Sequence, residues 1–120
     1  MDLNRVTLIG NLAGDPELTK PPAGERVVRF ALATNYRWQG RDKTTRQSIE
    51  FHDVTAFGKL AEIIGAYVKR GSKVYVEGHL RTRTTEGKDG KRRKTTEVVA
   101  DNLIMLGHRG RRETPLAPSE

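Results

Sequence analysis

One segment of the chain, residues 59–70, has the periodicity of a helix, and this limits the folds that the whole chain can adopt. Its apolar residues recur at intervals of three and four, as they do on one face of an α-helix. They are Leu60, Ile63, Ile64, Tyr67 and Val68. Gly71 follows two basic residues, and glycine is typical just beyond a helix C-terminus. The other apolar segments are short or alternating, so the pattern predicts a β-rich domain with one helix in its middle.

Five other segments have strand-like patterns, three before the predicted helix and two after it. They span residues 4–12, 26–36, 48–57, 73–84 and 94–106. The second is the clearest, because Val28, Phe30 and Leu32 alternate with the residues of the other face. In the first, Gly10 predicts a bulge or a close approach of another backbone. In the third, the apolar positions change phase near His52, which predicts a β-bulge or a bend.

The segments between the predicted strands are loops of two kinds. Residues 14–25 are dense in glycine and proline, and residues 39–47 are polar and charged, which predicts a long hairpin loop. Three strands, a helix and two strands is the order found in the OB-fold. We therefore predict an all-β domain, a five-stranded Greek-key OB-fold barrel with one α-helix between strands 3 and 4. A small β-sandwich capped by a helix is the alternative.

Positive charge is concentrated in residues 81–94, RTRTTEGKDGKRRK, which carry seven basic residues and two acidic ones. The dipeptide Asp89-Gly90 in this stretch favours the turn of a β-hairpin. The whole chain has a net charge of +7 and a pI of about 10.1, which favours a polyanionic partner such as a nucleic acid. A basic arm binds such a partner because each neutralised phosphate releases counterions. The alternative is a solvated hairpin tip with no partner.

The sequence offers little for catalysis or metal binding. It has no cysteine, which excludes disulfide bonds and thiolate metal sites. Its histidines lack the spacing of metal-binding motifs, and Gly58-Lys59-Leu60 lacks the rest of a phosphate-binding loop. We therefore expect no enzyme activity, no metal and no cofactor. No apolar run approaches the ~20 residues of a membrane helix, and the N-terminus has no pattern of a signal peptide.

Three aromatic residues lie among basic ones in and beside the second and third predicted strands. Trp38 ends the second strand, and Phe51 and Phe57 lie six residues apart in the third, so a regular pleat would place them on one face. Aromatic stacking combined with cations along the backbone is how proteins bind single-stranded nucleic acids without base preference. The alternative is that Phe51 and Phe57 belong to the core. Trp38, beside a polar loop, is the least suited to burial.

Five segments carry a resemblance to a known family. In chain order they read NRVTLIGNLAGDPEL, VVRFALATNYRW, EFHDVTAFGKLAEI, YVKRGSKVYVEGHLRTR and TTEVVADNLIMLG, and they span nearly all of residues 3–107. In this order and spacing they resemble the bacterial single-stranded DNA-binding protein family. The resemblance implies a non-catalytic OB-fold that coats single-stranded DNA without sequence specificity during DNA replication, recombination and repair. It also implies a homotetramer in the cytoplasm, associated with the nucleoid.

The resemblance further implies roles for individual residues. The stacking positions fall on Trp38, Phe51 and Phe57, whereas a fourth aromatic position falls on Thr84 or Thr85, so that platform is absent. The expected phosphate contacts are Arg5, Arg37, Arg41, Lys43, Arg46, Lys59, Lys73, Arg81, Arg83, Lys88, Lys91, Arg92, Arg93 and Lys94. The expected subunit-interface residues are Asn4, Val6, Leu8, His52 and Tyr75.

The C-terminal residues 108–120 have no periodicity and contain two prolines. We therefore expect a flexible tail after a single DNA-binding domain of residues 1–107. Family members usually continue to an acidic tip that recruits replication and repair enzymes, and ETPLAPSE lacks such a tip, so we expect no recruitment by this chain. The missing tip and the missing aromatic residue leave a second function open. It is that of an interaction subunit, such as a primosome-type OB protein, which bridges enzymes and binds DNA as a secondary task.

Overall fold

The structure, a computed structural model, describes residues 1–108 and contains six strands and one helix in that part of the chain. The elements are β1 (Val6–Leu12), β2 (Glu17–Thr19), β3 (Val27–Gln39), β4 (Thr45–Phe57), α1 (Gly58–Tyr67), β5 (Ser72–Glu86) and β6 (Arg92–His108). The last strand ends one residue beyond the predicted domain boundary at residue 107. The predicted tail otherwise falls on residues 109–120, which lie outside the described residues.

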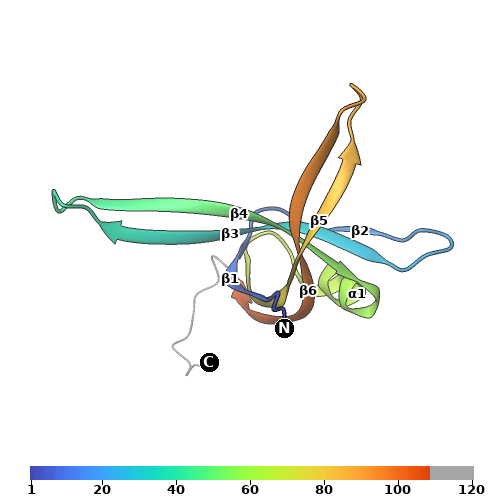
Figure 1. Ribbon diagram of the computed structural model, residues 1–120. Coiled ribbons are helices and arrows are strands. Elements are labelled where there is room, and N and C mark those ends of the chain that lie inside the picture. The colour runs from blue at the N-terminus through green and yellow to red at the C-terminus, as the bar shows by residue number, and fades with distance from the viewer. Residues whose placement is uncertain (109–120) are drawn as a thin grey trace.

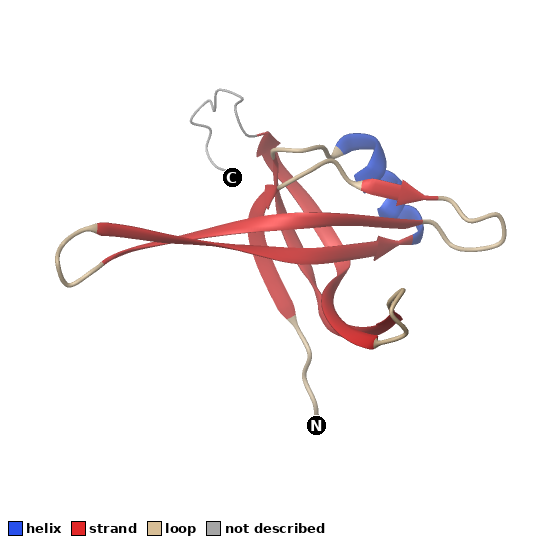
Figure 2. Ribbon diagram, turned by 90° about the horizontal axis from the view of Figure 1, so that it is seen from above, coloured by secondary structure: helices blue, strands red, loops and turns tan. Residues whose placement is uncertain are grey.

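Five of the strands form a closed barrel, which confirms the predicted OB-fold (Figures 1 and 2). The order in the sheet is β1-β5-β6-β4-β3-β2, and a further pairing of β1 with β3 closes it. Neighbouring strands are antiparallel except β4 and β6, which pair in parallel at Val54↔Val98 and Thr55↔Val99. The helix α1 follows β4, the third barrel strand, as predicted. The short strand β2 was not predicted, because its three residues lie in a segment dense in glycine and proline.

The core lies inside the barrel and under α1. The inward row of β3 (Val28, Phe30 and Leu32) is buried as the alternation predicted, and Ala61 and Ile64 of α1 are fully buried. The helix is shorter than predicted and ends at Tyr67. Val68 already has an extended backbone, and its side chain is buried in the core.

Gly10 marks a close approach of two backbones, one of the two alternatives that its position predicted. A Cβ atom there would lie 2.3 Å from the carbonyl oxygen of Ala33 on β3. The register of β1 with β5 runs without interruption from Val6↔Gly78 to Asn11↔Lys73, so no bulge is present. The missing side chain lets β1 pass from β5 to β3 and close the barrel.

Two long β-ribbons, β3–β4 and β5–β6, extend from the barrel in different directions (Figure 1). The prediction of a loop over residues 39–47 is wrong, because only residues 40–44 separate β3 from β4. Both faces of this projecting ribbon are open to solvent, so its strands carry polar residues and lack the alternation that marks a strand over a core.

Of the bulge or bend predicted near His52, the bulge is absent. The register of β3 with β4 is continuous from Val27↔Phe57 to Gln39↔Thr45. The phase of apolar positions changes because Ile49 and Phe51 are exposed on one face of β4, whereas Val54 and Ala56 lie on the other face, toward the core. Thr55, on the outer face, is buried as well. Its hydroxyl bonds to Glu97, which covers it from β6.

Candidate nucleic-acid interface

A groove of about 500 Å³ lies on the outer face of the barrel. The segment after β1, strands β3 and β4, and the base of the β5–β6 ribbon line it. Its charged lining residues are four carboxylates and two guanidinium groups, on Asp15, Glu17, Asp53, Glu97, Arg29 and Arg83. Of these six residues, only Arg83 was predicted from the sequence as a binding residue. Asp53 shares the strand face of Phe51 and Phe57, and this spacing of two residues could have identified it.

Glu97 is the most buried charged side chain described in the groove, with 3% of its surface exposed. The hydroxyl of Thr55 donates to Glu97 Oε1 at 2.8 Å, and Arg81 Nε donates to Oε2 at 2.9 Å. Burial by itself would raise the pKa of Glu97. The hydrogen bonds from Arg81 and Thr55 outweigh burial, so the pKa of Glu97 lies below its ordinary value.

This arrangement changes the role predicted for Arg81. Its guanidinium pairs with the buried Glu97 carboxylate through two nitrogens, so Arg81 is not a free cation for phosphate. Its guanidinium carbon also lies 5.1 Å from the centre of the Phe57 ring. Arg81 therefore contacts the Phe57 ring and neutralises Glu97, and its phosphate contact stays a prediction.

Arg83 remains available for a ligand. It lies opposite Thr95 in the register of β5 and β6 and lines the groove. Its Nε is buried but has no hydrogen-bond partner among the residues that the structure describes. A buried donor without a partner costs free energy. Because Arg83 is only part-buried and lines the groove, the exposed part of this side chain can meet an acceptor there. The predicted phosphate contact of Arg83 fits this position.

Two of the predicted stacking residues share one face of β4. Phe51 and Phe57 pair with Ala33 and Val27 in an uninterrupted register, and Phe51 is 65% exposed. The alternative that Phe51 belongs to the core is therefore wrong. Phe57 is half-buried, at the start of α1. Between the two rings lie Asp53 and Thr55, which line the groove.

Trp38 lies on the other face of the β3–β4 ribbon. Trp38 pairs with Arg46 of β4, so the two side chains lie on the same face. Arg46 precedes Phe51 by five residues on that strand, and an odd spacing along a strand places side chains on opposite faces. Arg37 is the immediate neighbour of Trp38 and so lies on the Phe51 face, opposite Gln47. The three predicted stacking residues therefore do not lie on a single face of the ribbon. Trp38 is 41% exposed, which agrees with the prediction that it is not a core residue.

A fourth aromatic residue, which sequence reasoning missed, contacts Trp38. The ring of Tyr36 stacks on the indole, with 5.6 Å between ring centres and 23° between ring planes. Tyr36 is 67% exposed. Its position two residues before Trp38 on a strand was the available signal.

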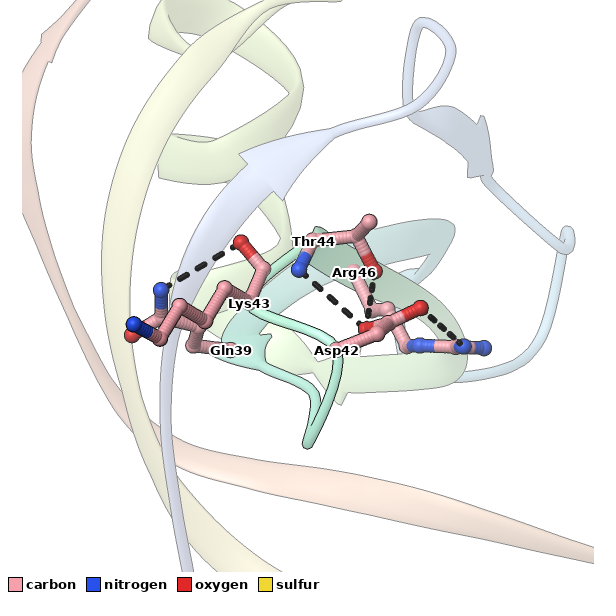
Figure 3. A network of polar contacts seen from close by, with 5 residues as sticks. All are labelled: Gln39, Asp42, Lys43, Thr44 and Arg46. Atoms are coloured by element: carbon pink, nitrogen blue, oxygen red, sulfur yellow. Dashed lines mark hydrogen bonds and ion pairs between the residues drawn. The ribbon is translucent and has the colours of Figure 1, made fainter.

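The tip of the β3–β4 ribbon is held by a polar network around Asp42 (Figure 3). The backbone N–H and the hydroxyl of Thr44 both donate to Asp42 Oδ1, at 3.2 and 2.6 Å. Arg46 lies 3.5 Å from the other carboxylate oxygen, and Gln39 donates to the Lys43 carbonyl at 3.3 Å. The hydrogen bond from the Thr44 hydroxyl is the main cause of a lowered pKa of Asp42. Arg46, a predicted phosphate contact, is thus partly neutralised.

Three other predicted phosphate contacts on this ribbon carry exposed cations. They are Arg37, Arg41 and Lys43. Lys43 has a φ of 66°, in the left-handed region that a side chain rarely adopts. These residues are available for phosphate but lie away from the groove lining.

The basic stretch of residues 81–94 is mostly strand, with only residues 87–91 outside β5 and β6. The turn predicted at Asp89-Gly90 is confirmed, since Gly90 has a φ of 78° and its N–H donates to the Gly87 carbonyl. The register pairs Arg83 with Thr95 and Thr85 with Arg93 on one face. It places Arg92 and Lys94 on the other.

Six predicted phosphate contacts of the tip and of the barrel surface have no part in the groove lining. All are exposed, and they are Lys88, Lys91, Lys94, Arg5, Lys59 and Lys73. Arg92 is exposed as well, and Arg93 lies 3.5 Å from Asp89. Their phosphate contacts stay predictions.

Three of the predicted interface residues are engaged within the chain. The Asn4 side chain donates to the Leu80 carbonyl and accepts from the Leu80 N–H, both at 2.8 Å. Val6 and Leu8 pack against the core of the same barrel, because they occupy the inward face of β1. Their side chains therefore do not form an outward contact surface, and Ile9, 52% exposed, is the outward apolar residue of this strand.

The other two predicted interface residues, His52 and Tyr75, are partly exposed. The Thr34 hydroxyl lies 2.8 Å from His52 Nε2, and Tyr75 donates to Glu77 at 2.9 Å, which raises the pKa of Tyr75. In the register of three adjacent strands, Tyr75 lies between Ile9 and Ile104. Half of each isoleucine is exposed, so this row forms an apolar patch.

Residues 3–106 match the Single-strand binding protein family. The chain belongs to this family. It is 44% identical over 109 residues to the single-stranded DNA-binding protein of Neisseria meningitidis serogroup A, which covers 91% of this chain and 63% of the relative. It is also 44% identical over 108 residues to the protein of the same name from Xanthomonas axonopodis pv. citri, covering 90% of this chain and 60% of that protein. The chain thus spans less than two thirds of the length of these relatives.

A solved structure described as the Plasmodium falciparum SSB complex with ssDNA is similar to this family member. The TM-score is 0.78 with 29% sequence identity, covering 88% of this chain and 96% of the other. Among residues 1–108, no group of three or more His, Cys, Asp or Glu side chains is arranged to bind a metal ion. The one described helix is too short to span a membrane.

Proposed function

We propose that this chain binds single-stranded DNA without sequence specificity, by stacking bases on aromatic rings and by pairing phosphates with lysine and arginine. The observation that carries the proposal is the face of β4, where exposed Phe51 and half-buried Phe57 lie at either side of groove residues Asp53 and Thr55. Stacking there needs no particular base, because every base has a π-face. Arg83, with its unpaired Nε, supplies a cation at the same groove.

The relatives support this proposal in two ways. Those from Neisseria and Xanthomonas are named for single-stranded DNA binding, and the similar Plasmodium structure is a complex with ssDNA. By extension, we propose that the chain coats exposed single strands during DNA replication, recombination and repair, in association with the nucleoid. Binding is its whole task in this proposal, with no reaction and no cofactor.

The test is a titration that uses Trp38, the only tryptophan of the chain, as the fluorescent reporter. Oligo(dT) is expected to quench its emission to saturation, while duplex DNA of equal length has a much smaller effect. Trp38→Ala is expected to weaken binding to oligo(dT) by about 1–3 kcal/mol, measured by anisotropy of a labelled oligonucleotide. Equal affinity of the wild-type chain for both DNA forms would contradict the proposal.

We also propose that the chain assembles as a homotetramer of two isologous dimers. The patch of Ile9, Tyr75 and Ile104 supports this, as does the open edge of β1 beside residues 6–9, which pair on one side only with β5. Sedimentation at micromolar concentration is expected to give four times the mass of the chain. Ile9→Lys is expected to reduce that mass, and a wild-type monomer would refute the assembly.

A further inference from the structure

The inward row of β3 does not end with the barrel. Val28, Phe30 and Leu32 fill the core, and residues of the same parity continue along the projecting ribbon to Tyr36 and Trp38. There the barrel no longer covers them, and they are 67% and 41% exposed. Two large aromatic side chains on a ribbon that packs against no core within residues 1–108 add nothing to the barrel interior. Two adjacent exposed aromatic rings form an apolar surface, and contiguous apolar surfaces mark binding sites on proteins.

The two rings are already arranged for stacking. Their centres lie 5.6 Å apart and their planes make an angle of 23°, so one face of each ring is turned toward the other ring, and both side chains are exposed. The contact restricts the rotation of both side chains before any ligand arrives. A planar ligand that extends the stack therefore loses less conformational entropy than one that must order two free rings.

The surroundings of the pair suit a nucleotide. In the register, Trp38 lies opposite Arg46 and Tyr36 lies opposite Ser48, so a guanidinium group and a hydroxyl flank the rings on the same face. Asp42 partly neutralises the guanidinium group, and the hydroxyl donates to Glu50. Phe51, in contrast, lies on the opposite face, together with Arg37. The β5–β6 ribbon offers no equivalent, because the sequence has no Phe, Trp or Tyr after residue 78.

We propose that Tyr36 is a DNA-stacking residue, which forms with Trp38 a two-ring platform for bases on the face of the β3–β4 ribbon opposite Phe51. A bound single strand then contacts both faces of this ribbon. This inference rests on the proposed single-strand binding and adds to it a residue and a second contact face.

The experiment compares Tyr36→Leu with Tyr67→Leu, a matched control that removes an equally exposed tyrosine from α1. Anisotropy with labelled oligo(dT) measures affinity, sedimentation measures assembly, and urea unfolding confirms the fold. Tyr36→Leu is expected to bind about 5- to 100-fold more weakly, with unchanged mass and unfolding midpoint. Tyr36→Phe keeps the ring and is expected to retain wild-type affinity, as is Tyr67→Leu.

Each other outcome contradicts either the stacking role of Tyr36 or the proposed single-strand binding on which it rests. If Tyr36→Leu binds like the wild type while Trp38→Ala binds weakly, Tyr36 is not a stacking residue. If Tyr36→Leu instead lowers the mass of the assembly, the pair is a subunit contact. A wild-type chain that does not bind oligo(dT) would refute the proposed function itself, and the two failures are thereby distinguishable.

Discussion

The guanidinium carbon of Arg81 lies 5.1 Å from the centre of the Phe57 ring, while its nitrogens bond to the buried carboxylate of Glu97. One side chain thus links Phe57, a predicted stacking residue at the start of α1, to a charge on β6. The Arg81 guanidinium covers one face of Phe57, so a base has only the other face for stacking. The geometry of the groove therefore depends on the ion pair between Arg81 and Glu97, of which Glu97 lines the groove.

Arg81→Met is expected to destabilise the fold, because it leaves the Glu97 carboxylate buried without its cation. Removing one partner of a buried pair costs about 3–5 kcal/mol, and the 40% exposure of Arg81 favours the lower end of that range. Urea unfolding followed by circular dichroism measures the loss. The double variant Arg81→Met/Glu97→Gln is expected to recover most of it, and an equally unstable double variant would refute this account.

Stability is expected to fall at acid pH partly through Glu97. Its pKa in the folded chain lies below the ordinary value of 4.5, so its contribution is fully present above that value. The contribution is lost as the pH falls through the folded pKa. Other carboxyl groups titrate over the same range, so the measurement is the difference between wild type and Glu97→Gln. The wild type should lose more unfolding free energy than the variant below pH 4.5, and parallel curves would contradict the prediction.

Substitutions of the adjacent residues Arg92 and Arg93 test which face of the β5–β6 ribbon contacts the phosphates. Arg93 shares the face of Arg83, whereas Arg92 lies on the other face. Arg93→Ala and Arg92→Ala remove the same charge. We expect Arg93→Ala to reduce the slope of log affinity against log salt by roughly 0.7, the value for one phosphate contact on a single strand. Arg92→Ala is expected to change the slope less. Equal slopes for the two variants would show that the face of Arg83 and Arg93 contributes no more phosphate contacts than the opposite face.

Asp53→Asn is expected to strengthen binding to single-stranded DNA. The exposed carboxylate lies between Phe51 and Phe57 on the stacking face, where it repels phosphates, and unit charges about 4 Å apart in water interact by about 1 kcal/mol. A gain of a few-fold at low salt should disappear at high salt. Asp101→Asn, which removes an exposed carboxylate that does not line the groove, is the control. A loss of affinity in Asp53→Asn would show that Asp53 accepts a hydrogen bond from the DNA instead.

The barrel could be predicted from the sequence because its strands cover a core. Inward residues such as Val28 and Leu32 must be apolar, and this requirement leaves an alternation in the sequence. The ribbons lie over no core, so residues such as Thr45 and Gln47 form strands without that signal. The same lack of a core explains why residues 39–47 read as a loop.

The candidate site was predicted in its residue types but not in its geometry. Exposed Phe51 and the free Arg83 agree with the predicted chemistry. The pairing of Arg81 with Glu97 joins residues sixteen positions apart across two strands, and no local pattern shows which cation a buried acid will take. The opposite faces of Trp38 and Phe51 follow only from the exact register of β3 with β4.

The groove described above is lined by residues from Ala13 near the start of the barrel to Glu97 in its last strand. During synthesis from the N-terminus, β6, which contributes Glu97, is the last of the groove-lining strands to leave the ribosome. A nascent chain that ends before β6 lacks both this wall and the parallel partner of β4. The site thus exists only after the whole barrel has folded. A ligand that fills this site must therefore stabilise the complete domain and cannot stabilise a fragment of it.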